Sequence, residues 1–309
     1  MTLYLRENDV ASLMPAADAV PVIEESFRRL AAGEVANQPR LRLDLDGGRL
    51  ALMAAVDRGL GLAGSKTYAA TPRGVSFVVV LFDAAGATVA VLEANVLGQL
   101  RTGAASGVAA KHLARSGASR LGIIGCGFQA ETQVACIRAA VPVIDDVVAY
   151  CRTEERLAAF CAKVGAEAAE SHREAAQDRD VVVTATTSHD PVLRGEWLTP
   201  GALVCAMGAN DRRSRELDNV VLERAAFVCC DSKEQARLES GDLIEPVESG
   251  VLDWLEVHEL QEVVAGEVAG RASDDDIVVF KSNGLAAWDV ALAAAVVERA
   301  HAQGAGTDL

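Results

Sequence analysis

Residues 121–130 of the chain read LGIIGCGFQA, an apolar strand pattern that runs into a glycine turn. Gly125 allows the backbone to turn sharply off the strand, Gly127 leaves room for a pyrophosphate, and Ala130 lets the following helix approach the sheet closely. Free N–H groups at the start of that helix attract phosphate. The stretch therefore predicts a dinucleotide site with contacts from Gly125, Gly127, Phe128, Gln129 and Ala130.

A Gly-x-Gly-x-x-Ala match is weak evidence when it stands alone. In this chain an amphipathic stretch follows at 131–140, and a second apolar strand follows at 147–150. Strand, turn, helix and strand together have the length of a βαβ unit. The context therefore predicts a Rossmann-type domain.

The residues after the second strand indicate which dinucleotide binds. An NAD site usually has an acidic residue there for the ribose hydroxyls, whereas this chain has Cys151-Arg152-Thr153. A guanidinium pairs well with a ribose 2′-phosphate, which an acid would repel. We expect Arg152 and Thr153 to favour NADPH, with NADH possible; the alternative is that Arg152 is a solvated residue at a helix start.

Composition restricts the class of protein. The 309 residues exceed a usual single domain, so two domains are expected. A formal net charge of −15 argues against nucleic acid and anionic membranes as partners. No apolar run has membrane-spanning length, and residues 1–6 lack the features of a signal peptide. We expect a cytoplasmic protein.

Cysteine and histidine usage gives no metal signal. The five histidines are dispersed, and no Cys-x-x-Cys pair is present. We expect no metal, and reduced cysteines in the core. These cysteines are Cys126, Cys136, Cys151, Cys161, Cys205, Cys229 and Cys230.

Hydrophobic patterning predicts an α/β protein with a Rossmann-type dinucleotide-binding domain at 117–282 and an α+β substrate-binding and dimerisation domain at 1–116. The Ala-rich helix at 283–303 is expected to return to the first domain, and residues 304–308 are expected to be disordered. Strands of the first domain are predicted at 41–45, 50–56, 60–68, 76–82 and 88–92, and those of the second also at 180–186, 203–206, 227–230 and 277–281.

Three basic residues of the first domain have small or apolar neighbours: Arg40, Lys66 and Arg101. A cation in such surroundings is unlikely to be buried unless an anion meets it. A substrate carboxylate would supply that anion. The alternative is that each cation pairs with a structural Asp or Glu, of which this acidic chain has many.

Several short motifs together resemble the ornithine cyclodeaminase and mu-crystallin family over nearly the whole chain. The matching pieces are Gly64–Tyr68 (GSKTY), Gln99–Ser106 (QLRTGAAS), Gly125–Ala130 (GCGFQA), Thr184–Ser188 (TATTS), Gly208–Asn210 (GAN), Arg215–Asp218 (RELD) and Phe280–Gly284 (FKSNG).

The resemblance implies roles for particular side chains. Arg40, Lys66 and Arg101 would bind the substrate carboxylate, with Lys66 near the reacting carbon. Contacts to the cofactor would come from Thr184, Thr186, Thr187, Met207 and Ser282, although by pattern alone the threonines are equally well strand-end caps. The resemblance also implies a homodimer formed through the first domain.

Two positions depart from the family's cyclodeaminases, which have an acid/base Asp where this chain has Asn210 and a Glu near Ala51. An amide cannot exchange a proton at neutral pH, so ornithine deamination would lose its main catalyst. Asp211 is adjacent, but it is one residue out of register. The Asn form is similar to the family's ketimine reductases.

The resulting hypothesis is NADPH-dependent reduction of Δ1-pyrroline-2-carboxylate or Δ1-piperideine-2-carboxylate to L-proline or L-pipecolate. Arg40 and Arg101 would hold the carboxylate, Lys66 would keep the imine nitrogen protonated, and Asn210 would orient that nitrogen or a water molecule. Alternatives are an alanine-type amino-acid dehydrogenase, an ornithine or lysine cyclodeaminase, and a non-catalytic NADPH-dependent ligand-binding protein.

Overall fold

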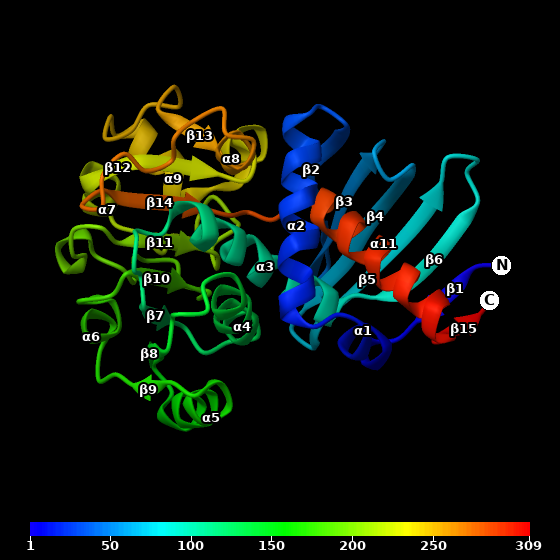
Figure 1. Cartoon of the computed structure of the whole chain (residues 1–309), viewed down its shortest axis with the longest axis horizontal. Coiled ribbons are helices and arrows are strands. Elements are labelled where there is room, and N and C mark those ends of the chain that lie inside the picture. Colours follow the sequence, from blue (N-terminus) through cyan, green and yellow to red (C-terminus); the bar gives the residue numbers. More distant parts are fainter. The chain divides into compact units, whose positions relative to one another are not determined.

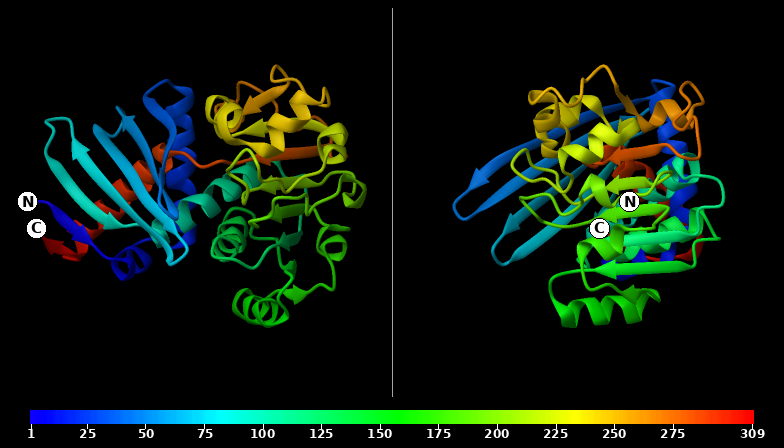
Figure 2. Two further views of the ribbon diagram at one scale, coloured as in Figure 1. Left: turned by 180° about the vertical axis from the view of Figure 1, so that it is seen from behind. Right: turned by 90° about the vertical axis from the view of Figure 1, so that its left-hand side faces the viewer.

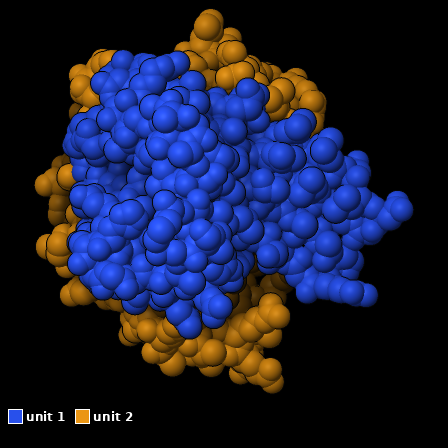
Figure 3. Space-filling model, turned by 90° about the vertical axis from the view of Figure 1, so that its right-hand side faces the viewer, with its two compact units in different colours: residues 1–101, 285–309 blue, residues 102–284 orange.

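The computed structural model describes residues 1–309, which form two compact units (Figure 3). Unit 1 contains residues 1–101 and 285–309, and unit 2 contains residues 102–284. The division falls inside helix α3 (Asn95–Leu113), whereas the sequence predicted a first domain that ends at residue 116. Helix α3 runs through residue 101 without a break, so its first residues belong to unit 1 and the rest to unit 2.

Unit 1 is built on a seven-stranded sheet with the order β15-β1-β6-β5-β4-β3-β2 (Figure 1). Neighbours from β2 to β6 are antiparallel, and β1 is parallel to β6. The elements are β1 (Leu3–Leu5), α1 (Glu7–Leu13), α2 (Ala16–Ala31), β2 (Val35–Leu45), β3 (Gly48–Asp57), β4 (Leu62–Thr71), β5 (Gly74–Asp83), β6 (Thr88–Glu93), α11 (Ala286–Gln303) and β15 (Thr307–Asp308).

Helices α2 and α11 form the core of unit 1 with the sheet. Helix α11 packs on β2 to β5 and on α2. Apolar residues recur along α2 at helical spacing, so that one stripe of the helix is buried. Within this core Phe27 of α2 and Trp288 of α11 meet edge to face, with ring centroids 5.2 Å apart.

Unit 2 contains an eight-stranded parallel sheet with the order β13-β12-β14-β11-β10-β7-β8-β9, whose strands lie side by side in Figure 2. This confirms the Rossmann-type domain, in which buried strands are apolar throughout. The elements are β7 (Arg120–Ile124), α4 (Ala130–Ala140), β8 (Asp146–Tyr150), α5 (Glu154–Val164), β9 (Glu167–Ala168), α6 (His172–Ala176), β10 (Val181–Thr184), η1 (Gly195–Trp197), β11 (Leu203–Ala206), α7 (Asn219–Arg224), β12 (Ala225–Cys230), α8 (Lys233–Glu239), α9 (Gly241–Glu248), β13 (Val257–Glu259), α10 (Leu260–Val264) and β14 (Ile277–Lys281).

Two local expectations are wrong. Thr307 and Asp308 are ordered as β15 because they pair with β1, a strand edge that is remote in sequence. Arg40 lies inside β2 and not before it, because β2 begins at Val35 and continues through an irregularity between Gln38 and Leu41.

The Phe27–Trp288 contact predicts the stability of unit 1. Phe27→Ala should lower the free energy of unfolding by about 3–5 kcal/mol, because both rings are fully buried and the cavity would be only partly refilled. Phe27→Leu, which keeps more of the volume, should lose less. Urea unfolding followed by circular dichroism measures both; a loss below about 1 kcal/mol for Phe27→Ala would contradict this packing role.

Candidate active site

The turn between β7 and α4 has the conformation that a pyrophosphate site requires. Gly125 has a φ of +110°, and a Cβ at this position would overlap the carbonyl of Ala185. A Cβ on Gly127 would point into open space, with no atom within 4 Å. The turn therefore leaves room beside Gly127 for a phosphate group.

A cavity of about 380 Å³ lies at the carboxyl ends of β7, β8 and β10. This is the edge of a parallel sheet at which dinucleotides bind. Four groups of residues line the cavity: Ile124–Gly127, then Tyr150–Thr153 with Arg156, then His172, and then Ala185–Ser188 with Asp190–Val192. Of the residues predicted to contact the cofactor, Gly125, Gly127, Arg152, Thr153, Thr186 and Thr187 line it.

The end of the cavity next to β8 carries the cationic side chain predicted to select the cofactor. Arg152, which precedes α5, lines the cavity and is exposed, and Arg156 in the first turn of α5 also lines it. His172 stacks edge to face on Tyr150 at 4.6 Å. Burial, and then the charge of Arg152, lower the pKa of His172. At neutral pH the positive charge beside Tyr150 thus comes from arginine.

Six predicted cofactor residues do not line this cavity. Phe128 is 54 % exposed and borders a separate hollow, while Gln129 and Ala130 form the start of α4. The other three, Thr184, Met207 and Ser282, are buried at the strand ends.

Unit 1 brings together the three predicted substrate-binding cations. Arg40, Lys66 and Arg101 are all buried, with 9 %, 2 % and 7 % exposure. Asp289 of α11 pairs with two of them: its Oδ2 lies 2.7 Å from Lys66 Nζ, and its Oδ1 lies 3.2 Å from Arg101 Nε. Trp288 faces the Arg101 guanidinium at 5.8 Å.

Strand register explains how the cluster forms. Lys66 in β4 pairs with Met53 in β3, and both side chains face the buried side of the sheet beneath α11. The irregularity in β2 places Arg40 on that buried side, where its Nε lies 3.4 Å from Met53 Sδ. Residues from β2, β4, α3 and α11 thus converge on one group of charges.

The surroundings of Lys66 change its acidity. Burial and the charge of Arg101 lower the pKa of Lys66 to about 7, although the charge of Asp289 acts in the opposite direction. The amine therefore exists in both protonation states near neutral pH. A lysine in this condition is suited to donating a proton to an imine nitrogen.

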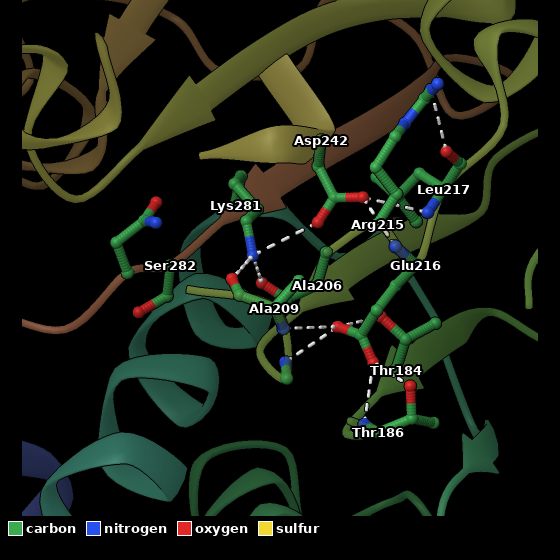
Figure 4. Close-up of polar contacts among 12 residues, drawn as sticks. Thr184, Thr186, Ala206, Ala209, Arg215, Glu216, Leu217, Asp242, Lys281 and Ser282 are labelled. Carbon is green, nitrogen blue, oxygen red and sulfur yellow. Dashed lines mark hydrogen bonds and ion pairs between the residues drawn. The ribbon is translucent and has the colours of Figure 1, made fainter. Parts of the chain in front are cut away.

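A second group of charges lies in unit 2, where Glu216 contacts Thr186, a residue that lines the dinucleotide cavity (Figure 4). Glu216 accepts hydrogen bonds from the turn after β11 and from the end of β10, and Lys281 of β14 pairs with Asp242 at 3.2 Å. Asn210 lies further along that turn and is exposed. Ser282 donates to Asp231 at 2.9 Å, which fixes the segment after β14.

Sequence reasoning missed Asp289, Asp242 and Asp231, and it quoted Glu216 and Lys281 only as parts of motifs. Asp289 carried a signal, because it is an acid inside an otherwise apolar helix pattern. Asp242 and Asp231 had none, since their partners lie in distant strands and turns.

Cysteines and metals complete the description of the site. All seven cysteines are free. Burial, and then a hydrogen bond with Cys151, raise the pKa of the Cys126 thiol far above its ordinary value, so it stays protonated beside the glycine turn. No group of His, Cys, Asp or Glu residues is arranged to hold a metal ion. No helix combines the length and apolarity needed to cross a membrane.

Comparison with known proteins decides the family. The sequence model of the ornithine cyclodeaminase/mu-crystallin family matches residues 2–304. The chain belongs to this family. Within it, alanine dehydrogenase of Archaeoglobus fulgidus is 36 % identical over 320 aligned residues, which cover 100 % of this chain and 98 % of that protein.

Two further relatives are reductases of a cyclic imine. Δ1-Pyrroline-2-carboxylate reductase of Bacillus cereus is 38 % identical over 273 residues, which cover 84 % of this chain and 83 % of the relative. The solved structure of Δ1-pyrroline-2-carboxylate reductase of Thermococcus litoralis, in complex with NADH and L-proline, has a TM-score of 0.93 and 31 % identity, with 100 % of both chains covered. The protein is therefore an oxidoreductase of this family, and its dinucleotide site is one for a nicotinamide cofactor.

The cluster in unit 1 predicts a lysine that titrates near pH 7. Asp289→Asn should lower the pKa of Lys66 further, because it removes the carboxylate that favours the ammonium form. Arg101→Met should raise it. Nitrogen NMR of ¹⁵N-labelled lysine measures the titration, and Lys66→Met assigns the resonance by removing it. A Lys66 pKa near its ordinary value of 10.5 would contradict this.

The same shift predicts how stability depends on pH. Between about pH 7 and 10.5 the unfolded chain keeps the Lys66 proton that the folded chain has lost. The free energy of unfolding therefore rises with pH through that window. Below pH 7 the folded chain buries a charged Lys66, which is when the burial costs most. Urea midpoints of wild type and Lys66→Met should converge as the pH increases.

Proposed function

We propose that the protein reduces a cyclic ketimine carboxylate, Δ1-pyrroline-2-carboxylate or Δ1-piperideine-2-carboxylate, with NADPH, forming L-proline or L-pipecolate. The observation that carries this proposal is the buried cluster of Lys66, Arg101 and Arg40, in which burial and the charges of both arginines lower the pKa of the lysine to about 7. Such a group suits a substrate that has a carboxylate next to a C=N bond.

Each cation has a separate task in this proposal. Arg40 and Arg101 hold the substrate carboxylate, because a guanidinium pairs with both of its oxygens. Lys66 holds a proton at Nζ for the imine nitrogen, and Asp289 keeps that amine in place. A protonated imine is the better electrophile.

The chemistry balances at the substrate. When bound, the reduced nicotinamide supplies a hydride. A C–H bond forms at C2, the π pair of the C=N bond becomes a lone pair on nitrogen, and the nitrogen keeps the proton it received. The two electrons gained by the substrate equal the two lost by the cofactor.

Asn210 supports reduction over cyclodeamination. Its amide can donate to or accept from a ring nitrogen or a water molecule, but it cannot act as an acid/base group. Deamination of ornithine or lysine requires repeated proton transfer to and from amine groups. Alanine-type dehydrogenation remains the second candidate, since the A. fulgidus alanine dehydrogenase matches the whole chain.

We also propose a cytoplasmic homodimer formed through unit 1. Strand pairing places Leu41, Leu43, Val56 and Val78 on the face of the sheet opposite α11, and all four are at least 38 % exposed. An apolar sheet face of this kind is typical of a subunit interface. A solved archaeal alanine dehydrogenase dimer with bound NAD, which has a TM-score of 0.92 to this chain, supports the proposal.

The proposed reaction is tested by measuring how fast NADPH is oxidised when a substrate is added. We expect rapid loss of reduced cofactor with a cyclic imine alone and little with pyruvate plus ammonia. Ornithine with the oxidised cofactor should release no ammonia, which is the product that a cyclodeaminase would form. Lys66→Met should lower kcat/KM at least about 100-fold. Arg101→Ala should raise the KM for the imine about 10- to 100-fold.

Arg299→Ala serves as the matched control for these variants. Arg299 lies in unit 1 but pairs with Asp18 at the surface, so its loss should change kcat/KM less than about twofold. Turnover only in the presence of ammonia would replace ketimine reduction by amino-acid dehydrogenation.

Arg152 predicts the choice of cofactor. Arg152→Ala should raise the Kd of NADPH about 10- to 100-fold and leave the Kd of NADH nearly unchanged, because only NADPH has a 2′-phosphate for the guanidinium. Titration of cofactor fluorescence measures both constants, with Arg173→Ala on the exposed side of α6 as control. If the wild type bound NADPH and NADH with equal affinity, the proposed preference for NADPH would be wrong.

A further inference from the structure

Glu216 is fully buried, and its carboxylate receives hydrogen bonds from two separate segments (Figure 4). At one oxygen, Oε1, the donors are the backbone N–H and the hydroxyl of Thr186, at 2.6 and 2.8 Å. At Oε2 the donors are the N–H groups of Gly208 and Ala209, at 2.7 and 3.2 Å, and the hydroxyl of Thr184, at 3.0 Å. One side chain thus joins the end of β10 to the turn after β11.

Close approach of these segments depends on Gly208. A Cβ on Gly208 would overlap the backbone nitrogen and oxygen of Thr186 as well as the Glu216 carboxylate. The turn is therefore pressed against the strand end that lines the dinucleotide cavity. Asn210 is two residues further along the same turn.

Lys281 and Asp242 hold the same turn from its other side. Lys281 Nζ donates to the carbonyls of Ala206 at 3.3 Å and of Ala209 at 2.5 Å. Asp242 pairs with Lys281, and it also accepts from the backbone N–H groups of Glu216 and Leu217 at 2.7 and 2.9 Å. Both the amides and the carbonyls of the turn are thus held by buried charges.

We propose that Glu216 is a positioning residue that couples the cofactor-lining end of β10 at Thr186 to the turn that presents Asn210. The proposal rests on the proposed function, in which Asn210 orients the reacting nitrogen. Glu216 touches neither cofactor nor substrate in this account. Its effect on turnover passes through Asn210. Asp242 holds the backbone N–H of Glu216, and Lys281 holds the carbonyls of the turn.

Glu216→Gln tests this with little change in size. A glutamine presents an NH₂ group where the carboxylate accepts hydrogen bonds, so it meets N–H donors with another donor. We expect kcat to fall about 10- to 100-fold, with the KM for the imine changed less than about threefold. In an Asn210→Ala background the same substitution should cost less than about threefold in kcat, because the residue through which it acts is absent.

Asp180→Asn is the matched control. Asp180 is also a buried carboxylate of unit 2 and accepts from the N–H groups of Ser119 and Arg120, but it precedes β10, at the opposite end from Thr184. Its loss should lower the melting temperature and leave kcat within about twofold. An equal kcat loss in Asp180→Asn, or a full Glu216→Gln loss in the Asn210→Ala background, would overturn the positioning role.

Amide hydrogen exchange of the cofactor-free protein gives a readout that needs no substrate. Glu216→Gln should speed exchange at Gly208, Ala209 and Thr186 at least about tenfold, whereas Asp180→Asn should not. Thr184→Val, which removes a single hydroxyl, should show a smaller change in the same direction if the glutamine variant does not fold.

The two proposals can fail separately. If the wild type reduces no cyclic imine but does turn over another substrate, the proposed function fails, and the kcat comparison is made with that substrate. If exchange at these three amides is unchanged in Glu216→Gln and in Thr184→Val, the positioning role fails whatever the substrate.

Discussion

A charge removed from water needs a counter-charge, and both candidate sites of this protein are organised around that requirement. In unit 1, Asp289 reaches from α11 to Lys66 and Arg101 and makes their burial tolerable. Because Asp289 does not cancel the effect of burial and of the neighbouring arginine, the pKa of Lys66 still falls to about 7. In unit 2, the buried ammonium group of Lys281 pairs with the buried carboxylate of Asp242. The positions of the reactive groups thus follow from where the chain places its buried acids.

The two sites divide the chemistry between them. Unit 2 supplies a parallel-sheet edge and a glycine turn with open space at Gly127, both of which suit a nicotinamide dinucleotide, and Arg152 at one end of the cavity is the residue that we propose for a ribose 2′-phosphate. Unit 1 supplies cations and a lysine that can release a proton near neutrality. Within a family whose members include alanine dehydrogenase and pyrroline-2-carboxylate reductase, our proposal of reduction in place of ornithine deamination rests on the amide at Asn210.

Local sequence signals predicted much of this arrangement. The apolar strand and glycine turn at 121–130 indicated the Rossmann-type domain, and small or apolar neighbours singled out Arg40, Lys66 and Arg101 as cations that need an anion. What the sequence did not show depends on contacts between distant segments. Asp289 pairs with Lys66 across 223 positions (289 − 66), and β15 forms only because β1 is beside it. The location of Thr184 behind the cavity, bonded to Glu216, likewise requires the folded sheet.

Isotope transfer tests the central claim, reduction at the C2 atom of a cyclic imine, most directly. The protein is incubated without ammonia with Δ1-pyrroline-2-carboxylate and reduced cofactor that carries deuterium at both positions of the nicotinamide C4, and the product is examined by proton NMR. The account predicts L-proline with one deuterium at C2, formed at least about 100-fold more slowly when Lys66→Met replaces the wild type. The account would be contradicted if the wild type left the imine unreacted. It would also be contradicted if deuterium entered an amino acid only after ammonia and a 2-oxo acid were added.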